Sequence, residues 1–158
     1  MVTATSPTSP RICFSVARAN DADGIARFLR RLSAASRRSA YLGTEPGLSV
    51  IARDRDAGVV VGQAVLVKAG GGVADVAVTV ADAYESHQIG AHLLERLMVE
   101  ARRHDIGTLR ADMLAHSHRM IDVFTWHGFA PVGSRMERLY LSLDGSTPRV
   151  EESAPARA

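Results

Sequence analysis

The sequence predicts an α+β domain in which a mixed, mostly antiparallel sheet of six to seven strands is flanked by four helices. Three observations predict this class. Segments typical of strands and helices follow one another in the order β-α-α-β-β-β-α-β-α-β-β over residues 11–143. Residues 73–95 form an apolar strand, a short polar turn and a helix that begins directly after the turn. Residues 126–132 combine the end of a helix, a glycine and a strand.

The first elements are a strand and two helices. Residues 11–17 predict a short strand. Asn20 or Asp21 can cap a helix whose apolar residues recur at the spacing of one buried face, namely Ile25, Phe28, Leu29 and Leu32. A second, short helix is expected over residues 33–42, and the glycines and proline that follow should end it.

Three strands come next and are joined by short turns. Residues 48–53 and 59–68 are the first two, connected by a hairpin-type turn over residues 54–58. The glycines at 70–72 form another turn, which leads into a strand over residues 73–80.

The second half of the chain completes the sheet. The helix after the polar turn has one apolar stripe and ends near His104; the stripe consists of Leu93, Leu94, Leu97, Met98 and Ala101. The remaining elements are expected as a strand over 108–114, a helix over 117–127, and closing strands over 129–132 and 136–143.

Composition limits the class of protein and its surroundings. The length fits one domain, residues 11–143, between polar segments 1–10 and 144–158 that we expect to be flexible. No segment has the roughly 18 apolar residues that cross a bilayer, so no membrane contact is expected. A net charge of +2 does not predict nucleic-acid binding. A single cysteine, Cys13, favours a reducing, cytoplasmic environment. The histidine spacing predicts no metal site.

Two motifs carry a resemblance to a known family. The turn Glu85-Ser86-His87-Gln88-Ile89-Gly90 resembles the acyl-CoA-binding turn of the GNAT N-acetyltransferases, where the pattern is Gln/Arg-x-x-Gly-x-Gly/Ala. The segment Trp126-His127-Gly128-Phe129-Ala130-Pro131-Val132 resembles the helix end and strand that follow in the same family. Residues 30–38 and 74–84 are similar to segments of the Pat-type protein lysine acetyltransferases within it.

The resemblance implies a site for acetyl-CoA as acyl donor. Asp75 occupies the position of a catalytic glutamate, and the backbone of Val78 and Val80 would bind the pantetheine arm. The remaining implied cofactor-binding residues are His87, Gln88, Ile89, Gly90 and Ala91 at the pyrophosphate and Ser117 at a position where the family commonly has Asn. Phe124 occupies the position of a tyrosine that many members use as general acid, and the Pat-type group also lacks that tyrosine.

Alternatives stay open at three of these positions. Asp75 can be a solvated charge on a strand face, and Ser117 can be a helix N-cap. If Gln88 requires a positive φ, its side chain costs about 1 kcal/mol or more, whereas with a helical φ its N–H remains available. Glu85 places a carboxylate near the expected diphosphate.

Two functions therefore follow from the sequence. The first is an acyl-CoA-dependent N-acyltransferase that acts on an amine, plausibly a protein lysine side chain, with a carboxylate as general base. The second is a weakened GNAT-fold module that senses CoA, binds a partner or regulates. Either function is compatible with a monomer or a homodimer.

Overall fold

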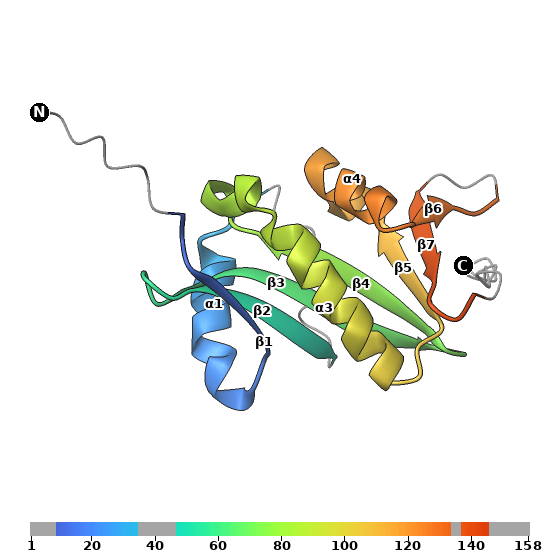
Figure 1. Ribbon diagram of the computed structural model, residues 1–158, viewed down its shortest axis with the longest axis horizontal. Coiled ribbons are helices and arrows are strands. Elements are labelled where there is room, and N and C mark those ends of the chain that lie inside the picture. Colours follow the sequence, from blue (N-terminus) through green and yellow to red (C-terminus); the bar gives the residue numbers. More distant parts are fainter. Residues whose placement is uncertain (1–8, 35–46, 134–136, 146–158) are drawn as a thin grey trace, which may run out of the picture.

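One mixed sheet forms the centre of the molecule (Figure 1). The computed structural model describes residues 9–34, 47–133 and 137–145. Within them the sheet has seven strands in the order β1-β2-β3-β4-β5-β7-β6. The strands are β1 (Ile12–Val16), β2 (Leu48–Asp54), β3 (Val59–Gly70), β4 (Val73–Val80), β5 (Thr108–Asp112), β6 (Ala130–Pro131) and β7 (Arg138–Ser142). Neighbours pair antiparallel apart from β4 and β5, which are parallel. The predicted mixed sheet is confirmed.

Helices connect the strands at the expected places. The α-helices are α1 (Ala22–Arg30), α3 (Ile89–Arg103) and α4 (His118–Trp126), and the 3-10 helices are η1 (Ala19–Asp21), η3 (Asp82–His87) and η4 (Met113–Ala115). The expected helix over residues 33–42 lies almost wholly outside the described residues. In the part of the chain that is described, no helix is long and apolar enough to cross a membrane.

Two differences from the prediction lie near the site. The polar turn before α3 is the 3-10 helix η3. The strand expected over residues 108–114 ends at Asp112, because the Asp112 side chain accepts the N–H of Leu114 and starts η4. This early end of β5 turns the chain away from β4.

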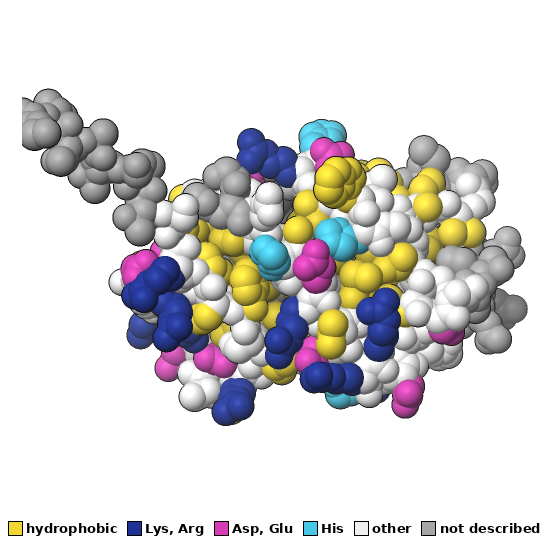
Figure 2. Space-filling model, in the orientation of Figure 1, with side chains coloured by type: hydrophobic (Ala, Val, Ile, Leu, Met, Phe, Trp, Pro, Cys, Tyr) yellow, Lys and Arg dark blue, Asp and Glu magenta, His cyan; other side chains and the backbone are white. Residues whose placement is uncertain are grey.

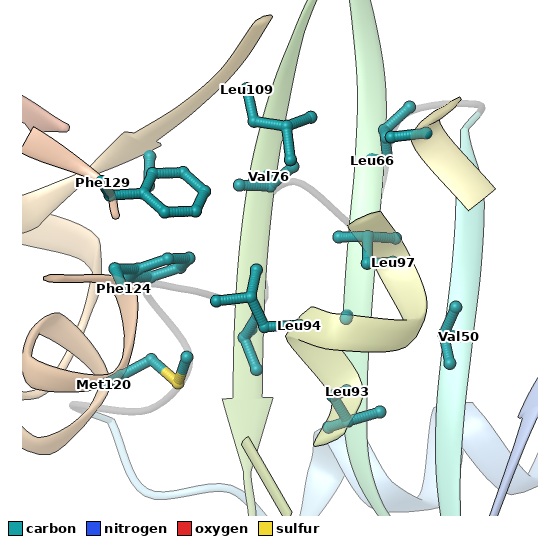
Figure 3. Packing of buried hydrophobic residues seen from close by; sticks show 14 of the residues in the cluster. Val50, Leu66, Val76, Leu93, Leu94, Leu97, Leu109, Met120, Phe124 and Phe129 are labelled. Carbon is teal, nitrogen blue, oxygen red and sulfur yellow. The ribbon is translucent and has the colours of Figure 1, made fainter. Parts of the chain in front are cut away.

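The helices cover the two faces of the sheet unequally. One face carries α3 and α4 over a continuous core, whose packing between strand and helix side chains is visible in Figure 3. The labelled residues there are Val50, Leu66, Val76, Leu93, Leu94, Leu97, Leu109, Met120, Phe124 and Phe129. The other face carries α1, where Phe28 and Leu32 pack on Ile51 and Val60. The apolar stripes predicted for both helices are therefore confirmed as core.

A glycine brings α3 close to the sheet. A Cβ on Gly62 of β3 would lie 2.9 Å from Cδ1 of Leu93 and 3.3 Å from Cγ2 of Ile89. Real Cβ atoms rarely approach so closely, so the first turns of α3 depend on the missing side chain. The absence of a side chain at Gly62 thus allows the first turns of α3 to pack closely on β3.

Candidate functional site

The edge of β4 that faces β5 opens in its C-terminal half. The two strands pair only from Val73 with Thr108 to Val76 with Ala111, whereas β4 continues to Val80. Ala81 donates its N–H to the carbonyl of Val61 on β3. Because successive N–H groups of a strand point to alternate sides, those of Val78 and Val80 point toward β5. An open strand edge can bind an extended molecule that carries amide groups.

The N-terminus of α3 lies at the end of this open edge. A Cβ on Gly90 would lie 3.7 Å from Cγ2 of Val80 and 3.0 Å from the sulfur of Met120 on α4. The first turn, Ile89 to Ala91, therefore lies beside the last residue of β4. Its N–H groups and the positive end of the helix dipole favour an anion there. The edge and the turn together fit a long ligand with amides along its length and phosphates at one end.

The residue before α3 has a left-handed backbone. Gln88 has φ 57° and ψ 18°. Of the two backbone conformations that the sequence left open for Gln88, the structure has the one with positive φ. In that conformation a Cβ costs about 1 kcal/mol or more. His87 is the last residue of η3, and Glu85 lies half-buried in the same 3-10 helix. The turn thus has the position expected of a phosphate-binding turn, with a side chain where glycine is favoured.

A hydrogen bond anchors η3 to the hairpin between β2 and β3. The hydroxyl of Tyr84 donates to Oδ2 of Asp54 over 2.7 Å. This bond holds the pKa of Asp54 below its ordinary value, and it raises the pKa of Tyr84 above its own. The other oxygen of Asp54 accepts the N–H groups of Asp56 and Ala57 in the turn. The segment that precedes the candidate phosphate turn is therefore held by a specific contact.

Polar contacts lie along the outer side of α3, and one of them reaches the residue after α4. Glu95 on α3 lies 3.1 Å from Nε2 of His127, which follows α4. Further along α3, Arg96 lies 3.7 Å from Glu100. Figure 2 shows this face, where histidine, acidic and basic side chains are close to one another. Each pair has one exposed partner, Glu95 or Arg96, and such partly exposed pairs contribute little to stability, so the core contacts set the position of α3.

His116 lies in the opening between β4 and β5. Its Nε2 is 3.1 Å from the backbone nitrogen of Val78, and its Nδ1 is 2.7 Å from the carbonyl oxygen of Asp112. An N–H can only donate and a carbonyl can only accept, so the ring carries its proton on Nδ1 and Nε2 is the acceptor. The ring packs edge to face on Phe124, with centroids 4.8 Å apart.

The imidazole of His116 is neutral at physiological pH. Burial lowers its pKa below the ordinary value of 6.5, against the smaller opposing effect of Asp112. The sequence assigned no role to His116, which is one of the histidines whose spacing predicts no metal site, and did not predict its contact with Val78. No local pattern reveals a contact between residues 38 positions apart. Among the described residues, no group of three or more His, Cys, Asp or Glu lies close enough to hold a metal ion.

Asp75 lies on the opposite face of β4 from α3 and is paired with Arg110. The residues are direct neighbours across β4 and β5. Nε and Nη2 of Arg110 donate to the two carboxylate oxygens over 2.5 and 2.8 Å. The Asp75 side chain is 31% exposed and that of Arg110 14%. Both carboxylate oxygens of Asp75 are therefore paired with Arg110, on a strand face where the Asp75 side chain stays partly exposed.

Two α4 residues have structural contacts. Ser117 is the N-cap of α4, and its hydroxyl oxygen accepts the N–H of Met120 over 3.2 Å. This is the capping role that the sequence gave as an alternative to cofactor binding. Phe124 is fully buried, between His116 and Phe129. The position where many relatives were expected to have a tyrosine is therefore part of the core.

Comparison with known proteins bears on the family and the fold. Residues 17–129 match the model of the acetyltransferase (GNAT) family. No curated protein is similar enough in sequence to count as a match.

Several solved structures share the fold. The GNAT domain of S. lividans PAT superposes with a TM-score of 0.66 at 21% identity, over 82% of this chain and 89% of that one. The yncA protein of Salmonella typhimurium, solved with its cofactor acetyl-CoA, gives 0.64 at 19% identity, over 89% and 98%. The ribosomal-protein-S18-alanine N-acetyltransferase of Escherichia coli gives 0.64 at 17% identity, over 89% and 99%.

Proposed function

This chain belongs to the acetyltransferase (GNAT) family, and we propose that it transfers an acyl group from acetyl-CoA directly to the nitrogen of an amine. Acetyl-CoA is the donor substrate that fits the family. The observation that carries the proposal is the open edge of β4 beside the first turn of α3. Backbone N–H groups there are matched to an amide-bearing arm and to a diphosphate, whatever the side chains of the turn.

The residues of the site divide the work of the reaction. The N–H groups of Ile89, Gly90 and Ala91 would bind the diphosphate, and Gln88 and His87 precede them in the turn. The backbone of Val78 and Val80 would hold the arm and orient the thioester. An N–H at this edge would also stabilise the oxyanion that forms when the amine attacks. CoA supplies the leaving thiolate, so no covalent intermediate on the protein is needed.

A carboxylate is proposed to accept the proton of the attacking ammonium. Asp75 is our candidate, on the condition that Arg110 releases at least one of its oxygens. The acceptor is proposed to be a lysine side chain of a protein, because residues 30–38 and 74–84 resemble the Pat-type lysine acetyltransferases. Ser117 would contribute to donor binding through its position at the start of α4.

The second candidate function is a GNAT-fold module that binds CoA without efficient turnover. Two observations favour it: both oxygens of Asp75 are paired, and the N–H of Val78 already has a partner in the free protein. The two functions share donor binding and differ in turnover, so measurements of each separate them.

Calorimetric titration with acetyl-CoA, followed by mass spectrometry of lysine-containing peptides and proteins, tests the function. We expect saturable binding and acetylated lysine. Saturable binding without any acetylated acceptor would favour the module. No binding at millimolar acetyl-CoA would refute both functions.

Substitutions of the Asp75–Arg110 pair test the base. Asp75→Asn keeps the shape of the side chain and should lower kcat by about 100-fold or more if Asp75 accepts the proton, with unchanged acetyl-CoA affinity. Arg110→Gln removes the partner and is the matched control, because it breaks the same pair but leaves the carboxylate. If both variants lose activity in proportion to their loss of stability, Asp75 has a structural role and is not the base.

A further inference from the structure

We propose that His116 is an internal ligand of the donor site, whose imidazole occupies the N–H of Val78 in the free protein and must move away when an acyl-CoA binds along β4. This inference rests on the proposed function, since it concerns the same strand edge. It assigns to His116 a role in setting donor affinity: the residue competes with the donor for one backbone group.

The chemistry of the contact is that of a substitute for a carbonyl group. The carbonyl of Asp112 holds the proton of the ring on Nδ1 and thereby leaves Nε2 as an acceptor. Nε2 accepts the N–H of Val78 over 3.1 Å, as the carbonyl oxygen of a neighbouring strand or of an amide-bearing ligand would. One N–H makes one good hydrogen bond, so the ring and a ligand carbonyl exclude each other at Val78.

The position of the ring adds a steric argument. β5 ends at Asp112 and the chain turns into η4, so His116 returns to β4 beyond the last paired residues, Val76 and Ala111. There the ring packs edge to face on Phe124, and its Nε2 lies 3.1 Å from the nitrogen of Val78 at the open edge of β4. An extended molecule bound to Val78 along this edge needs the same space. The ring must therefore move both to make room for the ligand and to release the N–H of Val78.

The structure also indicates how the ring can leave. The side chain is half-buried, and the residues that follow it, from Ser117 to Arg119, are exposed at the start of α4. The ring makes hydrogen bonds to Val78 and Asp112 and packs against Phe124. Rotation of one side chain toward solvent would free the N–H of Val78 without unfolding α4, whose cap is Ser117.

Binding measurements on matched variants test the competition. Removing the ring by His116→Ala should tighten acetyl-CoA binding roughly fivefold, the factor that corresponds to one net hydrogen bond. His104→Ala is the control, since it removes an exposed histidine at the opposite end of α3 from the first turn. It should leave the dissociation constant unchanged.

Nuclear magnetic resonance of the unaltered protein gives a readout that depends on neither mutation nor activity. In the free protein, the ring nitrogens of His116 should report a proton on Nδ1 and an acceptor at Nε2. Saturation with acetyl-CoA should shift the ring signals of His116 and the amide signal of Val78 together, whereas those of His104 should stay in place. A proton on Nε2 in the free protein would overturn the inference.

The outcomes separate this inference from the proposed function. Tighter binding by His116→Ala than by the unaltered protein supports the inference. If acetyl-CoA binds the unaltered protein without moving the His116 and Val78 signals, the inference fails and donor binding stands. If neither protein binds acetyl-CoA, the proposed function fails and the inference with it.

Discussion

Replacing Gln88 by glycine should stabilise the protein and strengthen donor binding through one local change. Gln88 has φ 57° between η3 and α3. An L-residue pays about 1–2 kcal/mol in this conformation. Glycine avoids that cost but loses more freedom on folding, by about 0.5–1 kcal/mol. The net gain is about 0.5–1 kcal/mol, which for a domain of this size raises the melting temperature by about 1–4 °C.

The chain offers a matched control for the backbone effect. Asp105, just after the end of α3, also has φ 57° and is exposed. Asp105→Gly should therefore stabilise the fold as well, by a smaller amount because Asp tolerates this conformation better than Gln, yet leave acetyl-CoA binding unchanged because it lies at the far end of the helix. Gln88→Ala keeps the Cβ and should give no stabilisation. Urea unfolding followed by circular dichroism measures the first effect, and calorimetry measures the second.

The effect on the donor depends on the charge of the turn as well. Gln88→Gly removes a Cβ from the place where the backbone would approach the diphosphate, and Glu85→Gln removes a carboxylate from η3. An exposed charge interaction is worth about 0.2–1 kcal/mol, so the double variant should bind acetyl-CoA about two- to fivefold more tightly. Equal affinity in the double variant and in Asp105→Gly would refute our assignment of this turn as the phosphate site. An unchanged unfolding midpoint in Gln88→Gly would refute the strain.

Two further predictions concern the elements that position the site. Gly62→Ala should cost about 1–3 kcal/mol in the free energy of unfolding, measured with urea, because its Cβ would lie 2.9 Å from Leu93; equal stability would show that α3 moves freely. Tyr84→Phe should remove the part of the pH dependence of stability that comes from Tyr84. The bond to Asp54 raises the pKa of Tyr84 above 10.0 in the folded protein. The contribution of this bond to the free energy of unfolding is therefore lost from the unaltered protein as the pH rises from 10.0 through the folded-state pKa, and Tyr84→Phe has no such contribution to lose. Parallel stability profiles of both proteins between pH 8 and 11 would contradict this.

Much of the fold could be predicted from the sequence because its signals are local. The stripe of α1 is buried where the spacing places Phe28 and Leu32. The alternation of β4 puts Val76 and Val78 in the core beneath α3 and Asp75 on the other face. In both cases the repeat of the helix or strand decides which side chains share a face, and this repeat can be recognised from consecutive residues of the sequence.

The chemistry of the site could be predicted less well because it depends on how β4 and β5 are paired. Arg110 meets Asp75, and His116 meets Val78, across 35 and 38 residues respectively. These contacts require the parallel register and the early end of β5, neither of which a single strand pattern contains. The φ of Gln88 was open for a similar reason, since it is set by the way η3 is joined to α3.

The need to satisfy backbone groups explains why the opening in the sheet has an internal occupant. A strand edge reserved for a ligand leaves N–H groups without strand partners in the free protein, and a buried N–H without a partner is costly. His116 supplies a partner to the backbone N–H of Val78. Among the described residues, every buried side-chain nitrogen or oxygen also has a hydrogen-bond partner. The same bond that stabilises the free protein must then weaken donor binding, because only one acceptor can use that N–H. Donor affinity and the stability of the free protein are therefore opposed at His116, whereas at Gln88 a single glycine is expected to improve both.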